Sequence, residues 1–355
     1  MMETRKICRL WERGDAIALV TLVRVEGSSY RRVGARLLIA ANGDYAGSIS
    51  GGCLEAEVIR KAQWMVSDGC AVVRRYSTLF DDTAEIPYGL GCGGTVDLLI
   101  EPASSAECVA LIEAMEAMQA ALHRQETGVV TWLPGPSGGL RREICDSTAA
   151  LRFRSQGFSS VAAEVFAERL YSPQRLLVLG AGDDAQPMVR MASLMGWSVT
   201  VLDGRAQWAR AERFPDAENV VATSTLGQFA LGENDAVIVM THSYEQDRAW
   251  LALVLPHAPR YVGLLGSRHR SALLVSEAAG LLGWPLERAC QGLFAPVGLD
   301  LGGDGAEAIA LATIAEVQAC CESKLGVSRR MTPEMVALQI AQGGASRYLQ
   351  AQCAL

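Results

Sequence analysis

The sequence predicts an α/β protein of two domains, in which a doubly wound parallel sheet follows a smaller α+β domain. From Arg175 onward, short apolar runs alternate with helical patterns, and this alternation is typical of parallel strands joined by helices. The first half of the chain contains strong hairpin signals instead, which favour antiparallel strands. The 355 residues are enough for two domains that each bury a core.

Composition narrows the class of protein. Hydrophobic residues make up 50% and charged residues 20%, as in an ordinary folded protein. The net charge of −7, with no basic block longer than a pair, argues against nucleic acid or an anionic membrane surface as a partner. The ten cysteines form no disulfide framework, the N-terminus has no signal-peptide core, and no apolar run is long enough to span a membrane. We therefore expect a cytoplasmic protein with reduced thiols.

The first predicted elements are a short helix, a strand and a hairpin. Residues Met2 to Gly14 have a helical pattern, and Ile17 to Val25 form an apolar, β-rich run. Asn42-Gly43 separates the runs Ala35 to Ala41 and Asp44 to Ile49. This dipeptide readily adopts the positive φ angles of a tight hairpin turn.

Three arginines, Arg31, Arg32 and Arg36, lie between the first strand and the hairpin, close to serines and a glycine. Their planar guanidinium groups suit a phosphate or a carboxylate, and we take Arg36 as a candidate cofactor-binding residue. Solvated surface arginines are the alternative for at least two of the three.

A cysteine follows the hairpin in the run Gly47 to Glu57, GSISGGCLEAE. Apolar residues at helical spacing from Leu54 to Met65 predict an amphipathic helix, so Cys53 falls in or beside its first turn. The amides and dipole of a helix N-terminus favour an anion and lower the pKa of a thiol there. Glu55 and Glu57 oppose this effect, because nearby carboxylates disfavour a thiolate.

Glycines surround this cysteine and a second one. In Gly51-Gly52-Cys53 the glycines let a ligand approach the backbone and could present amides to a phosphate. The loop Tyr88 to Thr95 holds Gly91-Cys92-Gly93 and leads into an apolar strand from Val96 to Ile100. We take both cysteines as candidate catalytic thiols in a site for an anionic, sulfur-containing or metal-centred ligand, although no Cys and His spacing fits zinc. The alternative for the first is a tight turn with a buried structural cysteine.

The rest of the first domain is predicted as a helix from Ala106 to Arg124 and a hairpin from Gly128 to Cys145 with the turn PGPSGG. Phe153 to Leu170 is interpreted as a linker or short helix, and Ser172-Pro173 as the domain boundary. We therefore expect domains at residues 1–165 and 172–325 and a helical tail at 326–355, whose last helix starts at Thr332.

The second domain opens with a β-α-β unit of the Rossmann-like, dinucleotide-binding kind. Arg175 to Leu179 is an apolar strand, Gly180-Ala181-Gly182 a tight turn, Ala185 to Met195 a helix and Ser198 to Leu202 a second strand. Ala185 stands at the third glycine position. Asp203 ends the second strand, close to the spacing of about 20 residues at which an acid meets an adenosine ribose.

Asp183 and Asp184 stand in the turn where a pyrophosphate would lie. Two carboxylates beside a dianion are repulsive unless they point away from it. Alternatively, Asp184 caps the helix that begins at Ala185.

Further parallel strands are predicted at Asn219 to Ala222, Ala236 to Met240 and Arg260 to Leu265, with helices between them. A glycine-rich return from Phe294 to Leu301 precedes a helix from Ala306 to about Cys321. In a doubly wound sheet the carboxyl ends of the strands form the binding crevice. We expect that crevice to gather Gly180, Gly182, Asp203, Arg205, Thr241, His242, Gly266, Ser267 and Arg268. For His242, a hydrogen-bonded structural role is the alternative.

Taken together, seven motifs resemble the XdhC/CoxI-type accessory proteins that mature molybdenum hydroxylases such as xanthine dehydrogenase. They cover most of the chain, from Ile17 to about Glu322. The motifs are GSSYRRVGARLLI (Gly27 to Ile39), GSISGGCLEAEVI (Gly47 to Ile59), GLGCGGTVDLLIEP (Gly89 to Pro102), LLVLGAGDDAQPMVRMASLMGWSVTVLDGR (Leu176 to Arg205), MTHSYEQD (Met240 to Asp247), YVGLLGSR (Tyr261 to Arg268) and APVGLDLGG (Ala295 to Gly303).

The resemblance implies an N-terminal cofactor-handling domain and a C-terminal Rossmann-like domain. It implies that the protein binds the molybdenum cofactor, helps it acquire sulfur from a cysteine desulfurase and delivers it to an apo xanthine dehydrogenase-type hydroxylase. Many relatives have histidine after GAG, where this chain has Asp183. The oligomeric state stays open, a homodimer included.

The alternative function is an oxidoreductase that uses NAD or NADP. Asp203 suits a ribose and Arg205 a 2′-phosphate, so the choice between the two cofactors stays open. Only the Rossmann-like unit supports this alternative, and a fold alone does not establish redox catalysis. The chain lacks iron-sulfur cysteine spacing and has no room for molybdenum and flavin modules beside its two domains.

Overall fold

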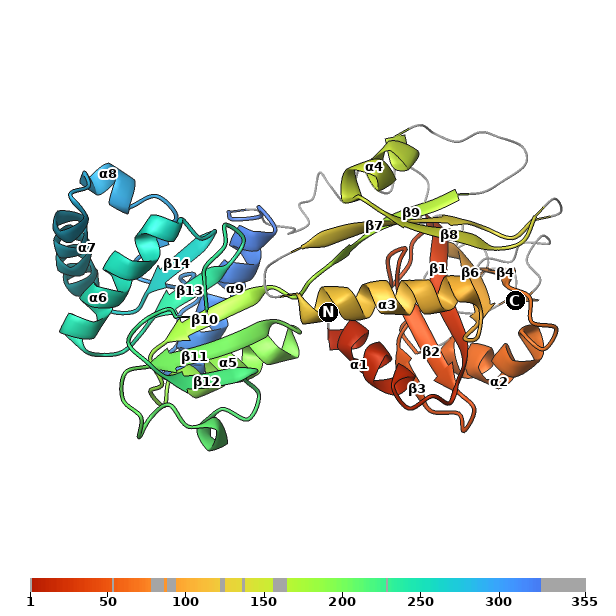
Figure 1. Ribbon diagram of the computed structural model, residues 1–355, viewed down its shortest axis with the longest axis horizontal. Coiled ribbons are helices and arrows are strands. Elements are labelled where there is room, and N and C mark those ends of the chain that lie inside the picture. Colours follow the sequence, from red (N-terminus) through yellow and green to blue (C-terminus); the bar gives the residue numbers. More distant parts are fainter. Residues whose placement is uncertain are drawn as a thin grey trace, which may run out of the picture.

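The computed structural model shows two lobes that lie side by side (Figure 1). It describes residues 2–52, 54–77, 86–87, 94–121, 125–135, 138–155, 165–227 and 229–326. The chain leaves the first lobe after β9 (Val165–Tyr171) and enters the second at β10 (Arg175–Leu179). Cys53, Gly91-Cys92-Gly93 and the helix predicted at Thr332 lie outside the described residues. The domain boundaries expected at residues 165 and 172 stay predictions.

A six-stranded sheet forms the body of the first lobe, in the order β3-β2-β1-β6-β4-β5. Its strand β1 runs antiparallel to β2 and β6, with Leu19 opposite Leu38 and Val20 opposite Ile100. The predicted hairpin is confirmed, because β2 and β3 pair antiparallel and Gly43 in the turn has a φ of +88°. The strands are β1 (Ala16–Gly27), β2 (Arg36–Ala40), β3 (Tyr45–Gly47), β4 (Val72–Ser77), β5 (Ile86–Pro87) and β6 (Gly94–Pro102).

Different helices cover the two faces of this sheet. On one face Leu19 and Leu38 pack with α1 (Met2–Trp11) and α3 (Ala106–Ala120) in one apolar cluster. On the other face Val20 and Leu37 pack with Val58 of α2 (Glu55–Met65). Successive residues of a strand point to opposite faces, which is why neighbours such as Leu19 and Val20 serve different cores.

A second, three-stranded sheet lies in the same lobe, in the order β8-β7-β9, and corrects one prediction. Residues 153–170 were expected to be a linker or short helix, but they include the end of α4 (Ser147–Ser155) and most of β9, which pairs antiparallel with β7 (Glu126–Trp132). The predicted hairpin of β7 and β8 (Arg141–Cys145) is confirmed. The apolar alternation of β9 is interrupted at Glu168, which falls between Phe166 and Leu170 on the face that points inward.

The second lobe is built on a six-stranded parallel sheet, ordered β12-β11-β10-β13-β14-β15, which confirms the doubly wound prediction. Leu176 of β10 lies opposite Val199 on one side and Ala236 on the other. The order reverses between β10 and β13, where such sheets bind ligands. The remaining strands are β11 (Ser198–Asp203), β12 (Asn219–Ala222), β13 (Ala236–Val239), β14 (Tyr261–Leu264) and β15 (Leu293–Phe294).

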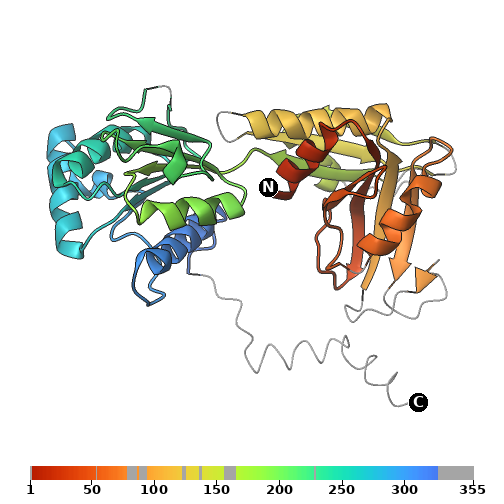
Figure 2. The same cartoon turned by 90° about the horizontal axis from the view of Figure 1, so that it is seen from below.

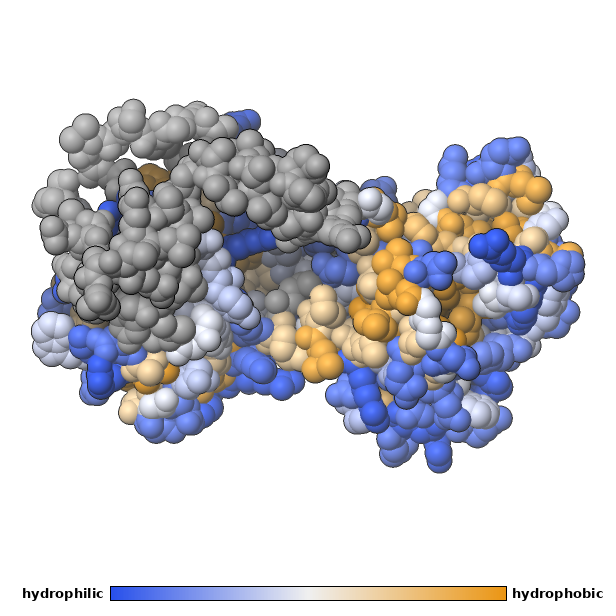
Figure 3. All heavy atoms as spheres, turned by 180° about the vertical axis from the view of Figure 1, so that it is seen from behind, coloured by the Kyte–Doolittle hydropathy of each residue, from blue (hydrophilic) through white to orange (hydrophobic). Residues whose placement is uncertain are grey.

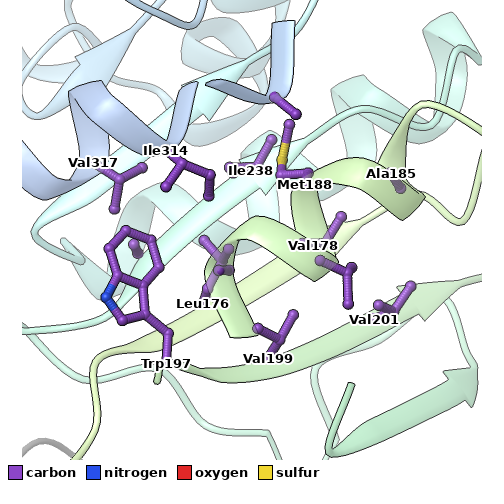
Figure 4. Close-up of a cluster of buried hydrophobic side chains, with 14 of the residues drawn as sticks. Leu176, Val178, Ala185, Met188, Trp197, Val199, Val201, Ile238, Ile314 and Val317 are labelled. Atoms are coloured by element: carbon purple, nitrogen blue, oxygen red, sulfur yellow. The ribbon is translucent and has the colours of Figure 1, made fainter. Parts of the chain in front are cut away.

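Helices cover both faces of the parallel sheet. Figure 2 shows α5 (Ala185–Leu194) and α9 (Ala306–Cys321) on the same side. Met188 of α5 and Ile314 and Val317 of α9 close an apolar core over Leu176 and Ile238 (Figure 4). The opposite core is closed by α6 (Tyr244–Val254) and α7 (Arg268–Leu282), with the short α8 (Leu286–Ala289) following α7.

The expected helix between β12 and β13 is absent from the described residues, and the connection before it, between β11 and β12, has no α-helix either. Only a 3-10 turn, Ala211–Arg213, lies between β11 and β12. Between β12 and β13 the described residues, 223–227 and 229–235, contain no helix. Both exceptions adjoin β12, an edge strand that is at most half-buried and needs no covering helix.

In the described part of the chain, no helix is both long and apolar enough to cross a membrane. On the face seen in Figure 3, hydrophobic residues gather on the second lobe among hydrophilic ones.

Candidate functional site

The glycine loop after the hairpin is folded around the carboxylate of Glu55, the first residue of α2. One oxygen, Oε1, accepts from the amides of Ile49 and Ser50 at 3.0 and 2.8 Å and from the Ser48 hydroxyl at 2.8 Å. The other, Oε2, accepts from the Gly52 amide at 3.1 Å and from the Ser50 hydroxyl. Burial alone would raise the pKa of Glu55, but the hydrogen bonds from Ser50 and Ser48 outweigh it and lower that pKa.

This geometry changes the expected role of the glycine pair. The Gly52 amide was predicted to bind a phosphate, but it donates to the Ser50 hydroxyl and to the Glu55 carboxylate instead. The Leu54 amide also donates to Ser50, at 3.1 Å. The backbone amides of Gly52 and Leu54, on either side of Cys53 in the sequence, are therefore both hydrogen-bonded. The negative charge of Glu55 is stabilised by hydrogen bonds from the loop. Gly51 faces Tyr30, because a Cβ at Gly51 would lie 3.6 Å from that ring.

Arg36, the candidate cofactor-binding arginine of the first lobe, forms an ion pair with a carboxylate of the protein itself. The side chain of Arg36 is 8% exposed, and its guanidinium pairs with Glu168 of β9 and donates to the Gly34 carbonyl at 3.0 Å. Arg31 likewise pairs with Glu3 of α1. Arg32 is exposed, and the described residues provide no hydrogen bond or ion pair for its guanidinium. The three neighbouring arginines thus have three different environments.

In the second lobe, Asp203 is fully buried at the carboxyl end of β11. Its Oδ2 accepts from the Ala181 amide at 2.8 Å and from a terminal nitrogen of Arg205 at 2.7 Å. Its Oδ1 accepts from the amide and the Nε of Arg205 at 2.8 and 2.9 Å. Burial raises the pKa of Asp203, but Arg205 and the backbone amides lower it further than burial raises it. Asp203 was predicted to accept hydrogen bonds from a ribose, but both of its oxygens already accept hydrogen bonds from the protein.

A second buried carboxylate, Asp247, was not singled out from the sequence. It is 1% exposed and accepts from the amide and hydroxyl of Thr241 at 3.0 and 2.6 Å and from Arg270 at 2.9 Å. Arg205 reaches the same cluster through the Thr241 carbonyl at 3.2 Å. Burial raises the pKa of Asp247 in spite of these donors. Asp247 belongs to the motif Met240 to Asp247, which pointed to this region, but the sequence does not show that its side chain is buried beside Thr241 and Arg270.

His242 and Asp184 close over the glycine turn. The Nε2 of His242 lies 2.7 Å from Oδ2 of Asp184, and His242 has a φ of 62°, in the left-handed region. A Cβ at Gly182 would lie 2.5 Å from Oδ1 of Asp184 and 3.5 Å from the His242 ring. Asp184 stands at the N-cap position of α5 without a capping side-chain hydrogen bond, so the alternative role proposed for it is wrong. Asp183 pairs with Arg213 at 2.6 Å.

The remaining predicted crevice residues follow the ends of β10 and β14. Gly180 has a φ of +127°, and a Cβ there would lie 2.4 Å from the Met240 carbonyl oxygen, so only glycine fits. Ser267 caps α7 by accepting from the Arg270 amide, while Arg268 is exposed at the start of that helix. Within the described residues, no hydrogen bond or ion pair joins Ser267 or Arg268 to Asp203 or His242.

The described thiols and carboxylates give no metal centre. Among those residues no group of three or more His, Cys, Asp and Glu side chains could hold a metal ion. The described cysteines are free thiols, and burial raises the pKa of Cys8 to about 11 and that of Cys108 as well. These two thiols are therefore protonated at neutral pH.

The fold and the crevice define a protein in which a Rossmann domain follows an N-terminal α+β lobe. Comparison with known proteins identifies the family. The family model for the XdhC Rossmann domain matches residues 176–317, and the model for the XdhC and CoxI family matches residues 10–77. The chain belongs to the XdhC and CoxI family.

Two curated relatives and one solved structure match most of the chain. The chain is 27% identical over 326 residues to a Bacillus subtilis protein named as a probable subunit of xanthine dehydrogenase, covering 87% of this chain and 94% of that protein. It is 28% identical over 308 residues to the Escherichia coli molybdenum cofactor insertion chaperone PaoD, covering 86% and 83%. A crystal structure from Bacillus halodurans, described as a xanthine dehydrogenase, matches with a TM-score of 0.75 at 26% identity over 95% of this chain and 99% of that one.

Proposed function

We propose that this protein is an accessory chaperone that binds the molybdenum cofactor, supports its sulfuration and inserts it into a xanthine dehydrogenase-type hydroxylase. The observation that carries the proposal is the similarity to the insertion chaperone PaoD, which extends over 86% of the chain and so includes both lobes. A cysteine desulfurase and the apo-hydroxylase are the proposed partners, in the cytoplasm, and a homodimer is the proposed assembly. The molybdenum cofactor is the cargo of this reaction.

The glycine loop supports a role for the first lobe. Cys53 is flanked by Gly52 and Leu54, whose amides are fixed by Ser50 and Glu55. Fixed neighbours restrict the positions a side chain can take, and this is what a thiol that meets a metal or carries sulfur requires. We propose that Cys53 and Cys92 are the thiols that engage the cargo.

The alternative, an oxidoreductase that uses NAD or NADP, is less well supported by the crevice. The fold would place a dinucleotide there, with its ribose at Asp203 and its pyrophosphate at Gly182. Arg205 already occupies both carboxylate oxygens of Asp203, and Asp184 and His242 cover Gly182. The residues present do not fit a dinucleotide unless both contacts break.

Mass spectrometry of the small molecules released from the purified protein tests the proposal. We expect a molybdopterin species. Release of NAD or NADP without any molybdopterin would favour the oxidoreductase instead.

A further inference from the structure

An open cavity of about 520 Å³ lies in the first lobe between α1, residues 30–36 and α3. We call it the arginine trough, and define it by Ile7, Tyr30, Arg31, Arg32, Arg36 and Met115. A neighbouring cavity of about 330 Å³ shares Arg36 and Met115 with it and continues along β9. Cavities of several hundred Å³ are the size of small-molecule sites.

The trough concentrates positive charge in an acidic protein. Three guanidinium groups and the carboxylate of Glu3 line it, and Glu168 of the adjoining cavity pairs with one of the three, while the whole chain carries −7. Glu3 holds Arg31 through two contacts, and Glu168 holds Arg36. Arg36 still has a buried Nε without a hydrogen-bond partner among the described residues. Arg32, exposed and unpaired in the described part of the chain, is therefore the guanidinium most available to an anion.

The trough has a buried apolar floor and an exposed aromatic ring at its rim. The side chains of Ile7 and Met115 are buried beneath it, each in a residue only 2% exposed. Tyr30 at its rim is 74% exposed, which is unusual for a large aromatic residue, and its ring rests against Gly51. An exposed aromatic ring beside arginines suits a planar ring that carries an anionic substituent.

We propose that the arginine trough binds the phosphate monoester of a planar heterocycle, with Arg32 and Arg31 holding the phosphate and Tyr30 stacking on the ring. Guanidinium groups match the geometry of phosphate oxygens. The identity of the heterocycle rests on the proposed function, because molybdopterin is a compound of this class. The contact between Tyr30 and Gly51 places the trough beside the loop that leads to Cys53.

Calorimetric titration of the full-length protein with guanosine 5′-monophosphate tests the site, with guanosine and inorganic phosphate as separate titrants. The probe contains a fused planar ring and a phosphate monoester. We expect Arg32→Gln to weaken binding of the probe by roughly tenfold or more, since a hydrogen bond to a charged group is lost. Tyr30→Leu should weaken binding of the probe and of guanosine but leave inorganic phosphate unaffected.

Arg9→Gln is the matched control, because Arg9 is an exposed arginine of α1 that does not line the trough. It should bind the probe like the wild type. Arg32→Lys keeps the charge and loses the planar fork, so an intermediate affinity would support the proposed geometry. No binding by the wild type, or equal affinity in wild type and Arg32→Gln, would overturn the proposal.

The same variants separate this inference from the proposed function. If wild type activates an apo-hydroxylase while Arg32→Gln binds the probe normally, the trough is wrong and the chaperone role stands. If Arg32→Gln loses probe binding but wild type activates no hydroxylase, the trough stands and its cargo is another phosphate ester.

Discussion

The carboxylate of Glu55 does for the glycine loop what a bound anion would do. It collects the amides of Ile49, Ser50 and Gly52 and the hydroxyls of Ser48 and Ser50. The sequence suggested that Glu55 would only disfavour a thiolate, since its side-chain direction cannot be deduced from composition or spacing. The structure gives it a second role, as the internal anion that shapes the loop.

Replacing Glu55 by glutamine should destabilise the protein at neutral pH by about 1–3 kcal/mol, because buried donors lose a charged acceptor. The pKa of Glu55 is lowered in the folded state, so its contribution is fully present above the pKa of the unfolded chain and is lost as pH falls through the folded value. The difference between wild type and Glu55→Gln in urea unfolding should therefore shrink on acidification. Glu113→Gln, at an exposed position of α3, is the control. A difference that stays constant or grows toward low pH would contradict the account.

At the scale of elements, the sequence pattern failed to predict a strand where a charged residue is buried in it. The parallel strands of the second lobe were predicted closely, because continuous apolar runs between glycines leave few alternatives. The strand β9 was missed, because Glu168 occupies an inward position that only its partner Arg36, far away in the sequence, makes tolerable. The crevice was predicted as a group, but Asp247 and the contact between His242 and Asp184 depend on tertiary packing that spacing does not encode.

Removing the carboxylate of Glu168 should leave Arg36 buried and unpaired. Truncating one partner of a buried pair typically costs about 3–5 kcal/mol, so we expect Glu168→Ala to lower the free energy of unfolding by that order. Glu143→Ala, on the exposed strand β8, should change it by less than about 0.5 kcal/mol. Chemical denaturation of both variants measures this. Equal stabilities would mean that the Arg36 pair does not hold β9 to the sheet.

At the scale of the molecule, a Rossmann domain is joined to a lobe that carries the proposed thiol site, and the fold alone does not make it a dehydrogenase. We expect neither NAD nor NADP to give a saturable calorimetric response up to about 1 mM, where the binding free energy would be only about 4 kcal/mol. The reason is that Arg205 saturates Asp203. A saturable response that disappears in Asp203→Asn would show that the crevice opens for a dinucleotide.

We propose that this protein delivers a sulfurated molybdenum cofactor through a thiol of the first lobe. Activation of an apo-hydroxylase in the presence of a cysteine desulfurase measures it directly, with wild type, Cys53→Ser and Cys92→Ser compared at equal folded concentration. We expect wild type to activate the enzyme and Cys53→Ser to lose most of that activity, with a smaller loss in Cys92→Ser. The reason is that Cys53 comes two residues before α2 in the sequence, and a helix N-terminus favours a thiolate. Full activation by Cys53→Ser would contradict the thiol's role, and no activation by wild type would contradict the chaperone function itself.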